Sequence, residues 1–322
     1  MKRVVRTTSI LALMAAVTVA PPLDAQTRAN GPWWPHPIWG PNDQAGGSNW
    51  ITPERVLEAI RLVKSGKVYE LGNVYERGMP MIGQRTFAMF IPSFPTYGPI
   101  GNTGIVFNDE FLCAEIGQVG TQFDGLGHVG KRLTMADGTT TDVFYNGVPA
   151  VEMRAPYGLT KLGVEQVKPI ITRGVLIDVA GFKGVDTLPS GYEITLVDVR
   201  GALARQGIRE ADLKPGDALL FNFGWWRLWP DPVRSNAPGP GVGREVAAWI
   251  VERKASMVGS DATSDVAMAV HEEVTLKHGI FNLEWMRFGD LLADRAYEFL
   301  FVFTPLRLKG ATGSPGRPLA IR

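Results

Sequence analysis

The stretch E-I-G-Q-V-G-T-Q-F-D-G-L-G-H-V-G, residues 115–130, decides how the rest of the chain is interpreted. Three of its polar residues, Gln118, Gln122 and Asp124, are separated by even numbers, so on an extended strand they would share one face. His128 follows four residues later, and the glycines between these positions rule out a helix. The pattern predicts a strand that ends in a glycine-rich turn, where the polar groups could hold a metal ion or polarise a carbonyl.

Within this stretch, residues 118–128 read Q-V-G-T-Q-F-D-G-L-G-H. They resemble the signature H-x-G-T-H-x-D-x-x-x-H of the bacterial cyclase family, which includes kynurenine formamidase and isatin hydrolase. Gln118 and Gln122 stand where that family has two metal-binding histidines. The positions that match the signature are Gly120, Thr121, Asp124 and His128.

The resemblance extends from about residue 40 to the end of the chain. His271, Gly279-Ile280 and Glu284 are similar to the family segment H-x-x-L-L-x-x-G-I-x-x-x-E, which supplies further metal ligands. Weaker similarities to the family's opening, core strands and C-terminus lie in residues 49–53, 65–72, 174–178, 215–225, 258–265 and 305–318.

The resemblance implies an α/β protein with a mixed sheet, of the swivelling β/β/α type and usually a homo-oligomer. It implies His128 as a catalytic acid or base, and a metal site formed by Gln118, Gln122, Asp124, His271 and Glu284. The expected cofactor is a divalent ion, Mn or Zn, with Mg as a third option. Amide oxygens in place of imidazoles favour Mn²⁺, Mg²⁺ or Ca²⁺ over Zn²⁺.

We therefore expect a hydrolase that cleaves an amide, cyclic imide or lactone bond of a small planar or cyclic substrate, similar to arylformamidase. Two other functions stay open: a lyase (dehydratase or cyclase) that uses the same groups, and a non-catalytic ligand-binding protein. A metal-free site is a further alternative, with Gln118 and Gln122 as donors to a substrate carbonyl and His128 paired with Asp124 or Glu284.

Aromatic residues are candidates for holding such a substrate. Trp225 and Trp226 follow a predicted strand, and Phe94 and Tyr97 lie in the long Pro- and Gly-rich segment 76–102. We expect them to form an apolar wall, although packing is the ordinary role of large aromatic side chains. The single cysteine, Cys113, lies between Leu112 and Ala114 and is predicted to be buried.

The N-terminus reads as a secretory signal. Lys2, Arg3 and Arg6 precede an apolar run at 10–20 that is too short to span a bilayer, and an A-x-A-like site ends at Ala25. We expect a periplasmic or secreted protein. Without residues 1–25 the chain keeps 30 basic and 31 acidic groups, and this balance gives no sign of a nucleic-acid or membrane partner.

The remaining 297 residues can bury a substantial core. We divide the chain into a signal peptide (1–25), an N-terminal arm and helix (26–65) and one catalytic domain (66–322). Helices are predicted from Pro53, at 195–206, 242–254 and 284–293, and buried strands at 174–180, 217–223, 256–259 and 298–304. A hairpin is predicted to pair residues 103–107 with 112–118.

Overall fold

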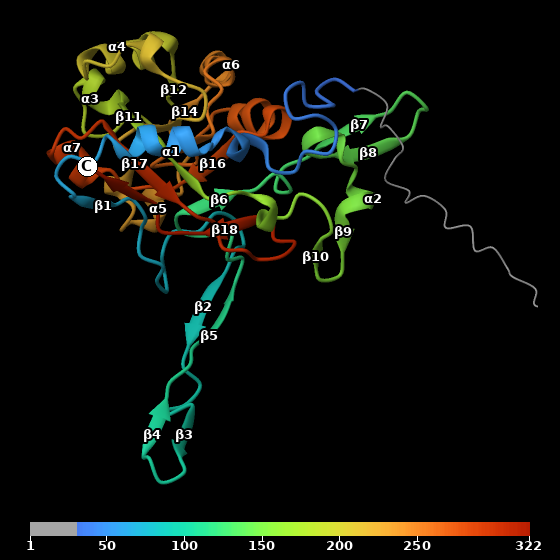
Figure 1. The fold of residues 1–322 in the computed structure, drawn as a ribbon, viewed down its shortest axis with the longest axis vertical. Helices are drawn as coiled ribbons and strands as arrows, with labels where there is room; N and C mark the ends of the chain where they lie inside the picture. Colours follow the sequence, from blue (N-terminus) through green and yellow to red (C-terminus); the bar gives the residue numbers. More distant parts are fainter. Residues whose placement is uncertain (1–30) are drawn as a thin grey trace, which may run out of the picture.

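A mixed nine-stranded sheet organises the computed structural model, which describes residues 31–322 (Figure 1). Four central strands are parallel, and the strands on both sides of them run antiparallel to their neighbours. In spatial order the strands are β1 (Val68–Glu70), β19 (Leu319–Ile321), β17 (Glu298–Phe303), β11 (Ile170–Asp178), β13 (Ala218–Asn222), β15 (Met257–Ser260), β16 (Phe281–Glu284), β6 (Gln122–Asp124) and β18 (Gly313–Pro315). The α/β class with a mixed sheet is therefore confirmed.

Both faces of the central strands are buried, because successive side chains of a strand point to opposite faces. Ile177 and Phe221 pack against the helices of one face, and Leu176 and Leu220 pack into a second core on the other. The helices are α1 (Pro53–Ile60), α2 (Ala150–Met153), α3 (Val179–Lys183), α4 (Leu196–Arg205), α5 (Pro232–Ser235), α6 (Arg244–Glu252), α7 (Gly289–Ala293) and a π-helix (Val270–Lys277).

Capping residues that can be identified in the sequence begin two of the helices. The Thr52 side chain accepts from the backbone N–H of Arg55 at the start of α1, and Thr195 with Asp198 forms a capping box on α4. The shorter 3₁₀ turns span Gly46–Trp50, Tyr145–Gly147, Val164–Gln166, Glu210–Asp212 and Trp225–Leu228. Among residues 31–322 no helix is long and apolar enough to cross a membrane.

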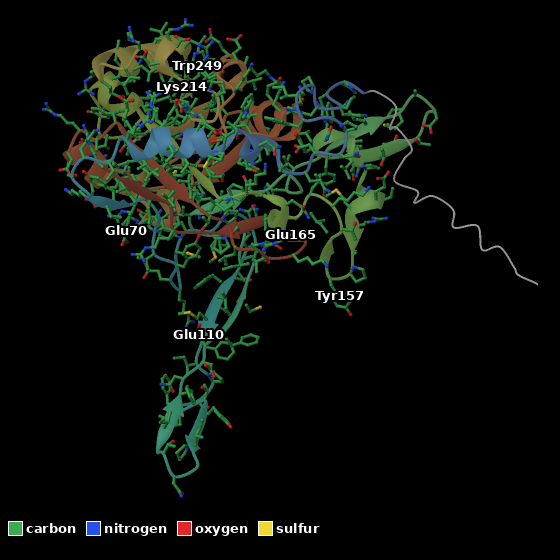
Figure 2. All side chains as sticks on the ribbon, in the orientation of Figure 1. Glu70, Glu110, Tyr157, Glu165, Lys214 and Trp249 are labelled. Atoms are coloured by element: carbon green, nitrogen blue, oxygen red, sulfur yellow. The ribbon has the colours of Figure 1, made fainter. Side chains whose placement is uncertain are left out.

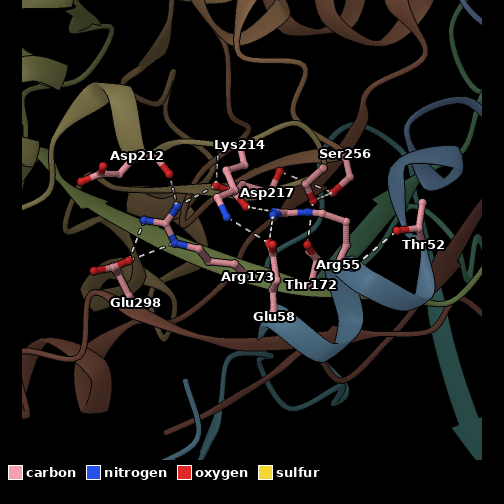
Figure 3. Close-up of polar contacts among 11 residues, drawn as sticks. Thr52, Arg55, Glu58, Thr172, Arg173, Asp212, Lys214, Asp217, Ser256 and Glu298 are labelled. Atoms are coloured by element: carbon pink, nitrogen blue, oxygen red, sulfur yellow. Dashed lines mark hydrogen bonds and ion pairs between the residues drawn. The ribbon is translucent and has the colours of Figure 1, made fainter. Parts of the chain in front are cut away.

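A buried ion-pair network ties α1 to the centre of the sheet (Figure 3). Asp217, whose side chain is 1% exposed, pairs with Arg55 of α1 and with Arg173 of β11. Arg173 also reaches Glu298 of β17 at 2.6 Å. The two arginines offset the burial of this carboxylate in part, since burial still raises its pKa, and they fix the helix against the sheet.

A long two-stranded ribbon projects from the body of the molecule (Figure 1). It spans residues 86–114, and pairs β2 (Phe87–Phe90) with β5 (Phe111–Ala114) and β3 (Tyr97–Ile100) with β4 (Ile105–Phe107). Smaller two-stranded sheets are formed by β7 (Lys131–Thr134) and β8 (Thr140–Val143), β9 (Arg154–Ala155) and β10 (Gly158–Leu159), and β12 (Glu193–Ile194) and β14 (Gly241–Val242).

Several local predictions were wrong. The hairpin expected between 103–107 and 112–118 does not form, because each of these segments pairs with an earlier strand of the ribbon. Cys113 is exposed, since the ribbon leaves the body. Residues 284–293 are not one helix: Glu284 ends β16 and α7 begins at Gly289. The signal segment lies outside the described residues, and the domain division stays a prediction.

Candidate active site

Two neighbouring strands place four polar side chains in one buried patch. β6 and β16 are antiparallel, with Asn282 opposite Asp124 and Glu284 opposite Gln122. The two members of each strand are two residues apart, so all four side chains lie on the same face of the sheet. Their exposure is between 0 and 3%. The alternation that predicted a shared face for Gln122 and Asp124 is therefore present.

Amide groups hold the two carboxylates of this patch. The Asn282 Nδ2 atom donates to Asp124 Oδ2 at 2.9 Å and to Glu284 Oε1 at 2.8 Å. Gln122 Nε2 donates to Glu284 Oε2 at 3.2 Å, and Gln118 Nε2 donates to Asp124 Oδ1 at 3.2 Å. Both glutamines thus turn their amide nitrogens toward the acids, and in this arrangement they act as donors that position the carboxylates.

His271 reaches the patch from the N-terminal end of the π-helix. Its Nε2 atom lies 3.5 Å from Asp124 Oδ2 and 4.0 Å from Glu284 Oε1. Its Nδ1 atom contacts Asp265 Oδ2 at 2.9 Å. Asp265 also accepts the backbone N–H groups of Val270 and His271, so one carboxylate caps the helix and orients the ring, leaving Nε2 directed at the acids.

His128 lies in the turn after β6, where its backbone N–H donates to the Gly125 carbonyl at 3.0 Å. Its Nε2 atom is 3.7 Å from Asp124 Oδ1, and its ring centroid is 5.9 Å from that of His271. The His128 side chain is 22% exposed, compared with 13% for His271 and 1% for Asp124. It is therefore the member of this group that solvent and a ligand reach most easily.

Close packing next to the patch requires glycine at two positions of the segment 115–121. Gly120 has φ +64, a left-handed conformation that favours glycine, and a Cβ there would meet the ring of Tyr75. A Cβ at Gly117 would lie 2.5 Å from the backbone of Gly313 on β18. These glycines let residues 115–121 pass close to neighbouring backbone before Gln122 enters the sheet.

The surroundings shift the pKa values of the two acids, Asp124 and Glu284, in opposite directions. Burial alone would raise the pKa of Asp124, but the nearby His128 and His271, with the Asn282 hydrogen bond, lower it to about 2. Burial and the neighbouring Asp124 charge raise the pKa of Glu284 well above its ordinary value. Burial opposes the charged form of His271, yet the nearby Asp124 carboxylate and the hydrogen bond to Asp265 raise the pKa of that ring to about 11.

Asp124, His128 and His271 can offer one ligand atom each, and these atoms lie within 4.8 Å of one another. The two His–Asp separations, 3.5 and 3.7 Å, exceed hydrogen-bond length. They match the spacing of about 3.4 Å between ligand atoms placed roughly 2.1 Å from a tetrahedral ion. Glu284, beside His271 Nε2, offers a further donor, so Asp124 and His271, with either His128 or Glu284 as the third ligand, fit a divalent cation.

The four aromatic residues predicted to hold a substrate lie in two parts of the structure, and no contact with the patch is recorded for any of them among the described residues. Trp225 is 4% exposed and donates its Nε1 to the Ser235 carbonyl at 3.2 Å, which gives it a packing role. Trp226 is half-buried, and its Nε1 finds no partner among the described residues. Phe94 and Tyr97 are 75% and 65% exposed on the projecting ribbon. The structure therefore does not bring Phe94 or Tyr97 to the patch within this chain.

Sequence reasoning assigned no role to two residues of the site. Asn282 lies two positions before Glu284 on one strand, a spacing that places both on one face. Asp265 belongs to the segment 258–265 and orients His271. The alternation on β16 was a readable signal for Asn282, whereas the contact between Asp265 and His271 depends on a loop that the sequence pattern does not define.

The chain also resembles known proteins. The family model described as "Putative cyclase" matches residues 43–265. A solved structure described as a novel cyclase is 33% identical, with a TM-score of 0.76, over 88% of this chain and 98% of that one. Isatin hydrolase A from Ralstonia solanacearum is 18% identical, with a TM-score of 0.54, over 80% of this chain and 92% of that one.

An isatin hydrolase bound to the product analogue thioisatinate is 16% identical, with a TM-score of 0.53, over 84% of this chain and 98% of that one. At such identities these two likenesses concern the fold alone. No curated protein shows a significant match to the sequence.

Proposed function

The chain belongs to the putative cyclase family, and from this premise we propose that it is a hydrolase that uses a divalent metal to cleave an amide, cyclic imide or lactone bond of a small substrate. The observation that carries the proposal is the convergence of Asp124, His271 and Glu284 on one buried point, with His128 beside it at the more exposed side. Such a hydrolysis uses acidic groups and imidazoles that lie together at a site open to solvent.

In this proposal Asp124, His271 and Glu284 hold the ion. When one ring nitrogen of a histidine binds a metal, a carboxylate hydrogen-bonded to the other nitrogen fixes the orientation of the ring. Asp265 has this relation to His271. Among residues 31–322 no carboxylate is hydrogen-bonded to the ring of His128, so we assign His128 no ligand role. A divalent ion bound there supplies Lewis acidity, which polarises a carbonyl oxygen and makes a water molecule more acidic.

His128 then acts as the acid and base. As water adds to the substrate carbonyl, the imidazole takes one of its protons, and it later returns that proton to the departing nitrogen or oxygen. Imidazole suits this exchange because its ring nitrogens can both accept and donate a proton. The bond broken is the acyl C–N or C–O bond, and the products are a carboxylic acid and an amine, amide or alcohol.

Gln118 and Gln122 keep the acids in place. Their amide nitrogens donate to Asp124 and Glu284, so a carboxylate oxygen of each acid stays directed toward His271. Where related enzymes are expected to have histidines, the two amides leave a site with fewer imidazole ligands. We propose that this shifts the metal preference toward Mn²⁺ or Mg²⁺ and away from Zn²⁺.

The test is a substrate panel with matched variants. The purified protein is given Mn²⁺, Zn²⁺ or Mg²⁺ and assayed on an N-formyl arylamine, a cyclic imide and an aromatic lactone, with ¹⁸O-labelled water as solvent. We expect metal-dependent turnover and ¹⁸O in the product acid. In His128→Ala, turnover should fall at least 100-fold while the metal is retained; His278→Ala, outside the patch, serves as the control.

Four outcomes count against the proposal. Turnover in His128→Ala within tenfold of the parent would remove the acid–base assignment. Loss of the metal in that variant would make His128 a ligand instead. A metal-dependent reaction without ¹⁸O in the product would favour a lyase, and binding of these compounds without any turnover would favour a ligand-binding protein.

We also propose that the protein is exported and forms a homo-oligomer. Export rests on the signal-like residues 1–25, and mass spectrometry of the protein from a periplasmic fraction tests it. A mature N-terminus at Gln26 is expected, and an intact Met1 would contradict cleavage.

A further inference from the structure

A pocket of about 250 Å³ opens at the carboxyl ends of the parallel strands β11 and β13. Asp178 and Asn222, which end these strands side by side, are 6% and 2% exposed and form its floor. α3 and α4 contribute to its wall, in the layer of helices that also holds Trp249 of α6 (Figure 2). In α/β proteins ligands bind outside the carboxyl ends of parallel strands. None of the metal-site residues lines this pocket, so it is a separate place for a ligand.

The buried acid of the floor already has its partners. Asp178 Oδ1 accepts from Asn222 Nδ2 at 2.7 Å and from the backbone N–H of Gly181 at 2.9 Å, and Arg205 Nη1 lies 3.4 Å from Asp178 Oδ2. Residue 181 has to be glycine, because a Cβ there would clash with both the carboxylate and the guanidinium. Since Asp178 and Arg205 compensate each other, the remaining groups of the pocket decide which ligand it takes.

Two arginines of the pocket lack an acidic partner. Among residues 31–322 no carboxylate lies within ion-pair distance of Arg227 or Arg295, although both side chains line the pocket. The Arg227 guanidinium lies over the Trp226 ring, 4.4 Å from its centroid, which orients it. The Arg295 N–H donates to the Leu292 carbonyl at 3.1 Å, so its backbone is held at the end of α7. Both arginines are therefore positioned while their side-chain donors stay available.

The loops around the pocket are held together before any ligand arrives. The Leu188 N–H donates to the Phe223 carbonyl at 2.9 Å, which joins the loop after α3 to the loop after β13. Gly224 has φ +78, and a Cβ there would clash with the backbone of Asp186. The Tyr297 carbonyl accepts an N–H of β11 at 2.8 Å. A ligand thus meets a pocket that is already formed, which lowers the entropy cost of binding.

Charge and size select the class of ligand. The pocket is lined by three arginines and two acids, Asp178 and Asp186, and so carries a net charge of +1 at neutral pH. Asp186 is exposed beside the arginines and would repel a second negative charge on a ligand. The volume is below the roughly 300–1,000 Å³ of pockets for drug-sized ligands. A small monoanion fits these limits, and a planar carboxylate matches the fork of an arginine.

We propose that this pocket is a second ligand site, which binds a small monocarboxylate. Arg227 and Arg295 donate to the carboxylate, and the Tyr297 hydroxyl, which has no partner among the described residues, is a further donor in the lining. The carbon atoms of the ligand pack against Val185 and Leu292, the apolar members of the rim. The proposal concerns binding alone, so it stands or falls independently of the proposed hydrolysis.

Isothermal titration of the purified protein with sodium butanoate tests the proposal. We expect one site with a dissociation constant of about 1 mM or below, and no binding of 1-butanol, which lacks the charge. In the double variant Arg227→Gln with Arg295→Gln, the affinity for butanoate should fall at least tenfold, because two charge-assisted contacts are lost. Arg154→Gln, on the β9–β10 hairpin far from the pocket, should leave the affinity unchanged (Figure 1). An unchanged far-UV spectrum shows that each variant is folded.

The acid at the rim supplies a change of opposite sign. Asp186→Asn should raise the affinity for butanoate about threefold and that for inorganic phosphate by more, because a repelling charge is removed. In Asp124→Ala, which alters the candidate metal site, butanoate should still bind.

Four results would overturn the proposal. They are no binding of butanoate to the wild type, tighter binding of phosphate than of butanoate, full affinity in the double arginine variant, and loss of binding in Asp124→Ala alone. The last result would place the carboxylate at the metal site instead.

Discussion

His271 lies between two carboxylates: its Nδ1 atom is 2.9 Å from Asp265 Oδ2, and its Nε2 atom is 3.5 Å from Asp124 Oδ2. The first distance is a hydrogen bond and the second is longer than one. Nε2 is therefore free to bind an ion together with Asp124. A cation that binds must displace the proton which the two acids otherwise hold on this ring, so metal uptake is coupled to proton release.

The support that Asp265 gives to His271 should be measurable in metal affinity. Asp265→Asn keeps an acceptor for the backbone of the π-helix but removes the charge behind the imidazole. We expect the affinity for Mn²⁺ to fall about 10–100-fold, as is usual when a hydrogen-bond partner of a ligand is changed. Isothermal titration of the metal-free protein gives the value, with Asp137→Asn on an exposed turn as control. Equal affinities in wild type and Asp265→Asn would contradict the orienting role.

The glutamines should decide which metal is preferred. In the double variant Gln118→His with Gln122→His, two imidazoles replace amides that make weaker ligands. We expect the affinity for Zn²⁺ to rise at least tenfold relative to Mn²⁺, as measured by competition with a chromogenic chelator. Gln166→His, outside the patch, controls for adventitious binding. An unchanged preference between the two metals would show that neither position faces the ion.

The ion-pair network of Asp217 should contribute strongly to stability. The substitution Asp217→Ala removes the acceptor of two partly buried arginines, Arg55 and Arg173, and also of the Lys214 backbone N–H. Breaking a buried pair from one side costs about 3–5 kcal/mol of the free energy of unfolding. Urea denaturation measures this loss. The exposed pair of Arg209 and Asp212 is the comparison, and Asp212→Ala should cost under about 1 kcal/mol. Similar losses of unfolding free energy in both variants would show that the buried network contributes no more to stability than the exposed pair.

Asp261 should make stability depend on pH. Burial raises the pKa of this carboxyl to about 7, although it accepts the backbone N–H groups of Phe223 and Trp226. The native state thus keeps a proton that the unfolded chain releases near pH 4. Because the folded pKa is the higher one, the stabilisation is complete below about pH 4 and is lost as pH rises to about 7.

Asp261→Asn tests this dependence, since an amide does not titrate in that range. The free energy of unfolding of the wild type should fall between pH 4 and 7 by about 2–3 kcal/mol more than that of the variant. Urea titrations at several pH values give both curves, and other titrating groups cancel in their difference. Two parallel curves would show that the Asp261 carboxyl has the same pKa in both states.

The site was predictable where one short motif or one strand supplied the signal. Gln122 and Asp124 share a strand, so their common face follows from the two-residue period. The likeness of residues 271–284 to a family segment indicated His271 and Glu284. The sheet register then places Glu284 opposite Gln122 of β6. The role of Asp265 was not predictable, because it lies in a loop without a periodic pattern and only the fold brings it to the His271 ring.

The ribbon was not predictable in the same way. Residues 103–118 contain two apolar runs around Asn108-Asp109, a pattern typical of a hairpin. Their true partners lie earlier in the chain, as in Phe87 with Ala114, 27 residues apart, and Tyr97 with Phe107, 10 residues apart. A local pattern cannot choose between such pairings. Cys113 was placed in the core because its neighbours are apolar, yet an apolar strand can also face another molecule.

Metal content tests the central claim most directly. The protein is purified without chelator, and its metals are measured by plasma mass spectrometry beside Asp124→Ala and the control Asp137→Ala. We predict about one equivalent of Mn or another divalent ion in the wild type and the control, and its loss in Asp124→Ala. No bound metal in the wild type, together with no gain in thermal stability on adding Mn²⁺, Zn²⁺ or Mg²⁺, would contradict a metal-dependent hydrolase at this site.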